Sequence, residues 1–471
     1  MQLAMTDPES ATRLCVSGYA VPGTAIDALD RATRRRLVVR GAEKRGAPIG
    51  AAVPEVPLVR RAGDLAVLPR ALGYELFGVP EKEDVRCPVP RPEIPFAGEL
   101  RSGGQQEMAA AVRRAFDAPH GPWGGICSAP CGFGKTAVCL EIVRSYLPAV
   151  IVTHAGHLAE QWRGATARFL PGARVGEIRQ ARFDVGDDID ICIAMVQTLA
   201  STRHSGKTFL SHHFRTAAFD ECHLVAASVF SRSLFEGTLG SRNRLGVSAT
   251  VDRTDGLTGV FSSHLGPVLF HATREIAEGE LTVTRLDNPR TDYPRRVHPV
   301  TGSLDFVSTV TDLVEDVERT SWIVSHVVAE MRREPRRRFL LLSDRRQHVT
   351  DLETALREAL PEGTTIAQYV GGMAPEALTA ARGAHVLLAT YQYASEGMDA
   401  DQLNAVLFAT PAAPAKIVQC VGRVQRKRHG NLSALVVDVV DSSLRSSWYK
   451  RSQVYRQMLD NRLPAPEGFV G

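Results

Sequence analysis

The chain has 471 residues, of which 44% are hydrophobic and 23% charged, and its formal net charge is +4. This length predicts about three domains. No apolar run approaches the ~20 residues of a membrane-spanning helix. The first residues also lack the basic and apolar regions of a secretory signal. We therefore expect an intracellular protein with no membrane partner, whose small net charge neither requires nor excludes nucleic acid.

The eight cysteines are scattered without paired spacing. This pattern predicts free thiols in a reducing compartment, the cytoplasm or the nucleus. Cys127, Cys131 and Cys139 lie around a glycine-rich loop. Because no CxxC pair is present, we interpret them as small buried residues and not as metal ligands.

Residues 1–95 differ in composition from the rest of the chain. Four prolines between residues 85 and 95 predict a linker. Residues 58–70 predict two short strands around a Gly-Asp turn. We therefore expect a small, partly β N-terminal accessory domain.

From residue 96 onward, short apolar strands alternate with helices, which is typical of parallel sheets covered on both faces. The pattern weakens over residues 281–318 and then repeats. It predicts an α/β protein with two tandem parallel-sheet domains, residues 96–285 and 286–471, the second ending in an amphipathic helix over 443–462. The strands are expected at residues 124–128, 149–153, 189–196, 216–220, 338–343, 364–370, 385–390, 405–410 and 434–440.

A glycine-rich loop follows the first of these strands and opens a predicted helix. It reads Ala129-Pro130-Cys131-Gly132-Phe133-Gly134-Lys135-Thr136. Gly132 and Gly134 let the backbone approach phosphate oxygens, and the N-terminus of the helix points at them. Lys135 supplies positive charge to the phosphates, and the Thr136 hydroxyl can bind Mg²⁺. We expect an ATP site here.

An acidic pair, Asp220 and Glu221, ends a later strand and is followed by His223. Acidic pairs are common on protein surfaces. At the end of a strand, downstream of a phosphate loop, Asp220 can instead hold Mg²⁺ through water while Glu221 polarises the attacking water.

Arg423 and Arg426 lie three residues apart on a predicted helix and so share one face. Planar guanidinium groups suit bidentate contacts with one phosphate cluster. A solvated basic face is the alternative, because Lys427 and Arg428 follow directly. Two further basic stretches, residues 31–40 and 332–338, are candidate phosphate contacts, although solvated helix faces are more common.

Taken in order, these segments resemble the motifs of superfamily 2 helicases of the DExH type. Residues 129–136 match the AxxGxGKT motif, 220–223 match motif II as DECH, 248–250 match SAT, and 419–426 match QxxGRxxR. Residues 153–162, 195–199, 339–345 and 389–399 match further motifs. The resemblance spans roughly residues 96–445. Residues 65–80 and 248–257 are also similar to XPB-like helicases and to the related helicases of large DNA viruses.

The resemblance implies two RecA-like domains with ATP and Mg²⁺ between them. It implies a nucleic acid, DNA more than RNA, as partner, and transcription or replication proteins as candidate partners of the N-terminal domain. The implied catalytic residues are Lys135, Asp220, Glu221, Arg423 and Arg426. The implied cofactor contacts are Gln105, residues 129–136, Gly397 and Asp399, with Thr136 and Asp220 at the metal. The implied nucleic-acid contacts are Thr153, Thr198, Ser343 and Thr390. The implied coupling residues are His223, Ser248, Thr250 and Gln419.

Two departures from the family pattern leave alternatives open. Residues 100–105 have one residue more than the family's usual LRxxQ, so either Gln105 or Gln106 could contact adenine. Val251 stands where many relatives have proline. The sequence does not distinguish a helicase from a duplex translocase or from the motor subunit of a restriction or repair complex. A nucleotide-regulated scaffold without turnover is a rival that the intact catalytic residues disfavour.

Overall fold

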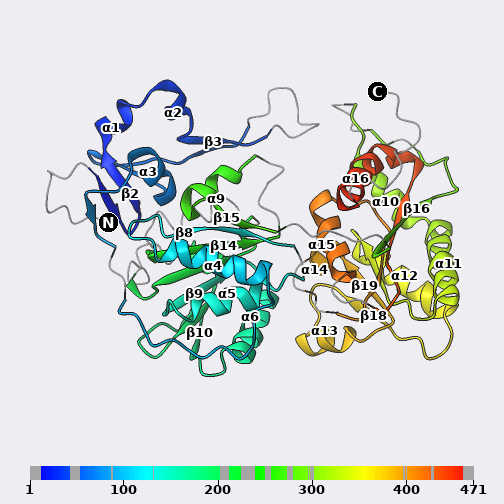
Figure 1. The fold of residues 1–471 in the computed structure, drawn as a ribbon. Coiled ribbons are helices and arrows are strands. Elements are labelled where there is room, and N and C mark those ends of the chain that lie inside the picture. Colours follow the sequence, from blue (N-terminus) through cyan, green and yellow to red (C-terminus); the bar gives the residue numbers. More distant parts are fainter. Residues whose placement is uncertain are drawn as a thin grey trace. The chain divides into compact units, whose positions relative to one another are not determined.

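A computed structural model gives the structure of the chain. It describes residues 12–42, 53–85, 88–130, 132–201, 212–223, 239–249, 256–272, 279–294, 296–297, 302–395, 398, 400–425 and 429–459. The chain divides into two compact units, Met1–Thr273 and Arg274–Gly471 (Figure 1). No helix in the described part of the chain is both long and apolar enough to cross a membrane.

The N-terminal part of unit 1 is a small β-rich module. Its five-stranded sheet has the order β5-β6-β2-β1-β7, and a separate antiparallel ribbon is formed by β3 and β4. The predicted strands around the Gly-Asp turn are β5 and β6, and Gly63 takes a positive φ of 60° in the turn. The elements are β1 (Arg13–Cys15), β2 (Gly18–Pro22), α1 (Gly23–Asp27), α2 (Arg31–Arg35), β3 (Val38–Arg40), β4 (Glu55–Pro57), β5 (Arg60–Ala62), β6 (Leu65–Leu68), α3 (Arg70–Phe77) and β7 (Lys82–Glu83).

This module shares its core with the rest of unit 1. Trp123 and Val260, which lie beyond the predicted linker, pack in the same apolar cluster as Tyr19 and Leu68. The Arg70 side chain is fully buried, and its Nη1 donates hydrogen bonds to the carbonyl oxygens of residues 241 (3.0 Å) and 242 (2.6 Å). The accessory module is thereby packed against the α/β part of unit 1.

The second part of unit 1 is an eight-stranded sheet of order β11-β10-β12-β9-β13-β14-β8-β15, parallel except for the β10–β11 pair. Helices α4, α5 and α6 pack on one face, and α7 and α9 pack on the other. The elements are α4 (Gly104–Phe116), β8 (Gly124–Ser128), α5 (Lys135–Val143), β9 (Ala149–Thr153), α6 (Gly156–Phe169), β10 (Val175–Arg179), β11 (Arg182–Phe183), β12 (Ile191–Met195), α7 (Val196–Leu199), β13 (Thr216–Asp220), β14 (Asn243–Ser248), α9 (Thr258–Leu265) and β15 (Val268–His271).

Unit 2 is built on a six-stranded, wholly parallel sheet of order β16-β21-β20-β17-β19-β18. Helices α11 and α12 cover one face, and α14, α15 and α16 cover the other. The elements are β16 (Leu281–Asp287), α10 (Phe306–Glu315), α11 (Val317–Arg333), β17 (Phe339–Ser343), α12 (Arg346–Ala359), β18 (Ile366–Tyr369), α13 (Pro375–Ala381), β19 (Val386–Thr390), α14 (Tyr391–Ser395), β20 (Ala405–Phe408), α15 (Pro414–Val424), β21 (Ala434–Val440), a short 3₁₀ turn (Ser442–Leu444) and α16 (Arg445–Met458).

The predicted fold class, two tandem parallel-sheet α/β domains, is confirmed. The boundary expected between residues 285 and 286, however, runs through β16, which pairs along its whole length with β21 in the second sheet. This strand was not predicted, because it lies at the sheet edge and mixes buried with exposed positions. An edge strand of this kind lacks the continuous apolar run of a buried parallel strand.

Candidate functional site

Three adjacent strands bring the predicted site of unit 1 together. Strands β13, β14 and β8 are neighbours in the sheet, and their registers pair Asp220 with Val247 and Ser248 with Ser128. Because the strands are parallel, the phosphate loop, the acidic pair and the SAT segment all leave the sheet at its carboxyl edge. Ligands of open α/β sheets bind at this edge.

Both glycines of the predicted phosphate loop have a left-handed backbone conformation. Gly132 and Gly134 have φ angles of 80° and 93°, which residues with a Cβ rarely adopt. The Lys135 ammonium donates to the carbonyl oxygen of Ala129 at 2.8 Å, and Thr136 lies in the first turn of α5. The loop and the N-terminus of this helix present backbone N–H groups suited to phosphate. Cys131 lies outside the described residues.

Gln105, and not Gln106, faces the phosphate loop. The Gln105 side chain is buried, and its Nε2 donates to the carbonyl oxygen of Phe133 at 2.5 Å while its Oε1 accepts from the Arg101 N–H at 2.8 Å. A Cβ at Gly134 would lie 2.4 Å from the same Nε2. The Gln106 side chain is exposed and makes a 3.4 Å contact with the carbonyl oxygen of Leu100. The inserted residue therefore leaves the first glutamine directed at the nucleotide loop.

Asp220 is held on both carboxylate oxygens. Its Oδ2 accepts a hydrogen bond from the Trp162 indole Nε1 at 2.8 Å, and its Oδ1 accepts from the Glu221 N–H at 3.1 Å. Glu221 itself has a φ of 44°, a strained value for a residue other than glycine. Such strain concentrates at functional sites, where the surrounding structure enforces it.

The pKa values of the Asp220 and Glu221 carboxyl groups are shifted in opposite directions. Burial, and then the charge of Glu221, raise the pKa of Asp220 to about 6. Burial alone would also raise the pKa of Glu221, but the hydrogen bond from His223 and the charge of Lys135 outweigh it and hold that pKa below its ordinary value. Glu221 is therefore ionised at neutral pH. Asp220 titrates near the physiological range, and a nearby cation stabilises its charged form.

The donor set fits a magnesium ion held jointly by protein, phosphate and water. Within the described ranges, no three His, Cys, Asp or Glu side chains converge as a metal cage would require. Mg²⁺ needs no such cage, because in nucleotide sites it takes one or two protein oxygens and completes its shell with phosphate and water. Asp220 and the Thr136 hydroxyl are the candidate protein ligands.

Glu221 is linked to the SAT segment through a short polar chain. The His223 Nδ1 lies 2.6 Å from the Ser248 Oγ and 3.3 Å from the Glu221 Oε2. The same Oε2 accepts from the Ser248 Oγ and from the Ala249 N–H, both at 3.4 Å. His223 and Ser248, both predicted coupling residues, thus contact the catalytic candidate directly. Thr250 lies outside the described residues.

The four predicted nucleic-acid contacts lie at carboxyl strand ends or in the turn beyond, but most of their hydroxyls are used inside the protein. Ser343 is fully buried, with its Oγ 3.0 Å from the His348 Nδ1. The Thr198 Oγ1 accepts from the Gln180 N–H at 3.0 Å, and the Thr153 Oγ1 donates to the Ala155 carbonyl oxygen at 3.5 Å. Thr390, paired in register with Ser343, is the most accessible of the four.

In unit 2, α15 carries Gln419 and Arg423, and both side chains are buried. The Arg423 Nη1 donates to the Met398 carbonyl oxygen at 3.0 Å, so this arginine contacts the segment that contains Gly397 and Asp399. Gly397, Asp399 and Arg426 themselves lie outside the described residues, as do Lys427 and Arg428.

Two contacts in the site were not predicted from the sequence. Trp162 was noted only as part of a helical motif, and its bond to Asp220 joins residues 58 positions apart. Arg101 donates to the carbonyl oxygens of Gly132 and Phe133. Neither pairing leaves a local spacing signal, since each depends on how the helix or loop packs on the sheet.

All six cysteines in the described part of the chain are free thiols, as predicted. Burial raises the pKa of Cys127, Cys139 and Cys222, which surround the site. They are therefore unreactive apolar residues of the core.

Comparison with known proteins agrees with this geometry. Residues 99–253 match the family described as type III restriction enzyme, res subunit. The chain is 26% identical over 392 residues to the Acanthamoeba polyphaga mimivirus protein named "Putative ATP-dependent RNA helicase L396", covering 82% of this chain and 72% of the relative. It is 24% identical over 379 residues to "Putative ATP-dependent RNA helicase QP509L" of African swine fever virus, covering 75% and 72%.

Among solved structures, S. cerevisiae Dbp5 bound to RNA and ADP BeF3 matches with a TM-score of 0.53 at 13% identity, over 75% of this chain and 88% of that one. At this identity the likeness concerns the fold, which is that of tandem RecA-like domains. Together with the ordered motifs, these similarities support an ATP hydrolase of the superfamily 2 helicase type, and the chain is similar to the helicases of large DNA viruses.

Proposed function

We propose that this chain couples ATP hydrolysis to movement along a nucleic acid or to its unwinding. The observation that supports this most directly is the contact of Glu221 with both His223 and Ser248. The group proposed to activate water is thereby joined to the segment proposed to sense nucleic acid. A change at either end alters the hydrogen bonding of the other.

In this proposal each residue has one task. Lys135 and the backbone of the phosphate loop bind the phosphates, and Gln105 contacts the adenine. Asp220 and Thr136 hold Mg²⁺, which supplies charge neutralisation at the phosphates when bound. Glu221 orients the attacking water and accepts its proton.

The remaining assignments belong to unit 2. Arg423 and Arg426 stabilise the charge of the leaving phosphate. An arginine in this role is worth as much as ~10³-fold or more in rate. Gly397 and Asp399 complete the nucleotide contacts. Gln419 and Thr250 join His223 and Ser248 in transmitting closure.

The nucleic acid along which the protein moves is proposed to be DNA. The protein itself is proposed to act in transcription or genome processing. RNA is the rival, because both viral relatives above carry RNA helicase in their names. The phosphate contacts proposed for Thr153, Thr198, Ser343 and Thr390 carry no sequence information, so no sequence specificity is expected from them.

Steady-state ATP hydrolysis tests the proposal. Wild type and Glu221→Gln are compared without nucleic acid and with single-stranded DNA, duplex DNA and RNA in turn. Stimulation by one of these, abolished in Glu221→Gln, supports the motor and identifies its track. Hydrolysis that no nucleic acid stimulates contradicts it. A strand-displacement assay then separates unwinding from translocation on duplex, because a pure translocase hydrolyses ATP without releasing a strand.

A further inference from the structure

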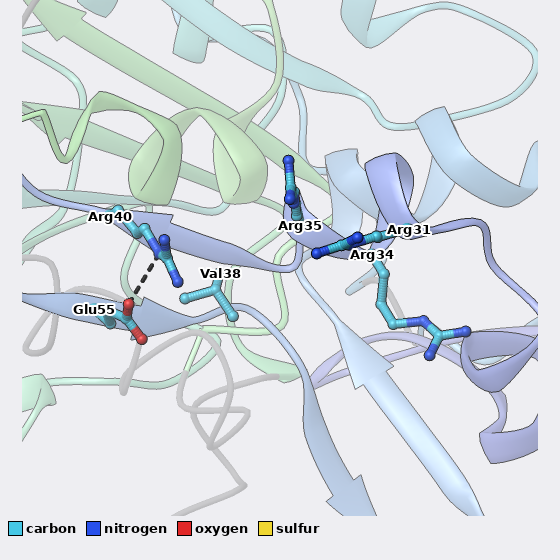
Figure 2. A pocket seen from close by; sticks show the side chains of 6 residues that line it. All are labelled: Arg31, Arg34, Arg35, Val38, Arg40 and Glu55. Carbon is cyan, nitrogen blue, oxygen red and sulfur yellow. Dashed lines mark ion pairs between the residues drawn. The ribbon is translucent and has the colours of Figure 1, made fainter.

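The N-terminal module contains a basic pocket far in sequence from the helicase motifs. It has a volume of about 910 Å³ and lies between α2 and the β3–β4 ribbon. Figure 2 shows the side chains that line it, three arginines from α2 and three residues from the ribbon. The described lining residues are Arg31, Arg34, Arg35, Val38, Arg40 and Glu55.

The residues that the structure describes leave most of the positive charge in this pocket unneutralised. Arg40 pairs with Glu55 at 2.9 Å. Glu55 is the one acidic residue among the described lining residues. Arg34 donates to two backbone carbonyl oxygens at 2.7 and 2.8 Å, which orients its guanidinium without cancelling its charge. The side chains of Arg31 and Arg35 are exposed and make no hydrogen bond or ion pair with any residue that the structure describes.

The second arginine-rich stretch of the chain differs in this respect. Arg333 and Arg337 both pair with Glu330, at 2.8 and 3.1 Å, and Arg336 pairs with Glu334 at 2.7 Å. These side chains stabilise their own helix end and the adjoining turn. Arg332 alone in this stretch has an exposed side chain with no ion pair to a described residue, whereas two such arginines line one pocket at α2, so the phosphate contact considered for both stretches is favoured at α2.

Helix stability does not account for Arg31, the first of the three arginines of α2 that line the pocket. Arg31 and Arg35 are four residues apart on one face, where like charges repel. Arg34 and Arg35 lie in the last turn, where the helix dipole favours cations, but Arg31 occupies the first helical position, where the dipole opposes it. Asp30 already caps this end by accepting from the N–H groups of Ala32 and Thr33. Arg31 is thus costly to the isolated fold, and a bound anion would compensate for it.

We propose that this pocket binds the sugar-phosphate backbone of a nucleic acid, outside the site formed by the helicase motifs. The proposal rests on the proposed function in one respect, that nucleic acid is the partner of this protein. Every cation among the described lining residues is an arginine, whose planar fork gives bidentate contacts with phosphate oxygens. No aromatic residue is among the described lining residues, so base stacking is not expected and binding should be independent of sequence.

The N-terminal module is packed firmly enough on the rest of unit 1 for this contact to position a bound nucleic acid. Its apolar cluster includes Trp123 and Val260, and the buried Arg70 ties α3 to the backbone at residues 241 and 242. A strand held by α2 would therefore keep a defined position relative to the sheet of unit 1. An acidic protein segment is the competing occupant.

The test measures binding of fluorescein-labelled single-stranded and duplex DNA to the full chain without nucleotide, between about 50 and 200 mM salt. Each phosphate contact contributes about 0.7 (single strand) to 0.9 (duplex) to the slope of log affinity against log salt. Arg31→Ala/Arg35→Ala should lower that slope by about 1.4 to 1.8 and weaken binding roughly tenfold or more at ~0.1 M salt. Arg31→Lys/Arg35→Lys should keep most of the slope.

Arg114→Ala/Arg168→Ala is the matched control, since it removes two exposed arginines of α4 and α6 that lie outside the pocket. It should leave the slope nearly unchanged. A slope unchanged in Arg31→Ala/Arg35→Ala, with a wild-type thermal melt, overturns the proposal. So does a result in which the variant loses binding of labelled poly-glutamate but not of DNA, because the pocket then takes an acidic peptide.

ATP hydrolysis by the same proteins separates this inference from the proposed function. Wild type stimulated by DNA, together with unchanged binding by the variant, defeats only the arginine pocket. Wild type that DNA does not stimulate defeats the motor, whereas a variant that has lost DNA affinity still supports the pocket. Hydrolysis without nucleic acid should be equal in wild type and variant.

Discussion

The Trp162–Asp220 hydrogen bond makes a prediction about pH. The indole N–H donates to the charged form of Asp220 at 2.8 Å and so lowers the pKa of that carboxyl, which burial has raised to about 6. Trp162→Phe retains an aromatic ring in the core but removes the donor. A hydrogen bond to a charged group is worth about 1.5–3 kcal/mol. The pKa of Asp220 should therefore rise by about one to two units, at 1.36 kcal/mol per unit.

The sign follows from which form of Asp220 is active. Only the carboxylate form of Asp220 binds a cation. In wild type, where the pKa of Asp220 is near 6, this form predominates at neutral pH. In the variant, where that pKa is about 7–8, it does not. At subsaturating Mg²⁺ its hydrolysis at pH ~7 should be about two- to tenfold slower, and the two rates should converge near pH ~9. A divalent cation competes with the proton, so saturating Mg²⁺ should reduce the difference.

The assay is steady-state ATP hydrolysis by Trp162→Phe across pH and Mg²⁺ concentration. Trp123→Phe is the matched control, because its indole N–H also donates a 2.8 Å bond, but to the carbonyl oxygen of Ala118 and away from the site. The control should lose stability without moving the acidic limb of the pH profile. If that limb is superimposable in wild type and Trp162→Phe, the reasoning about this bond is wrong.

Three further variants test the site and the fold. Asp220→Asn should abolish hydrolysis, and its gain in melting temperature over wild type should be larger at pH ~7 than at pH ~4. The folded pKa of Asp220 exceeds the unfolded one, so its ionisation costs the wild type roughly 2 kcal/mol as pH rises through that window. A difference between variant and wild type that is equal at the two pH values would contradict this. His223→Ala should retain ATP binding while losing most stimulation by nucleic acid, measured as the ratio of stimulated to basal hydrolysis; an unchanged ratio would show that this histidine does not couple the sites. Arg319→Ala should lower the free energy of unfolding by about 3–5 kcal/mol in urea titrations, because it leaves Asp441 buried without its partner. The exposed pair of Arg285 and Asp287 provides the comparison, since Arg285→Ala should cost less than about 1 kcal/mol.

Much of the fold and of the site was predictable because the signals are local. A short apolar strand, a glycine loop and a following helix predict the phosphate site from adjacent residues. Asp220 and Glu221 are recognisable in the sequence because they end a predicted strand. The choice between Gln105 and Gln106 was not local. The choice depended on which glutamine side chain of α4 faces Phe133. The one-residue insertion shifts the motif spacing, so the sequence alone does not identify that glutamine.

The sequence by itself determined the order of the motifs, the two parallel sheets and the kinds of side chain at each strand end. Only the tertiary structure decided which of those side chains meet. Trp162 reaches Asp220 because α6 packs on the sheet, and His223 reaches Ser248 because parallel strands bring distant segments to one edge of the sheet. It also decided that Ser343 is fully buried and that Arg31 and Arg35 face a pocket. Hydrogen-bond partners across a sheet are set by register and packing, which no local spacing records.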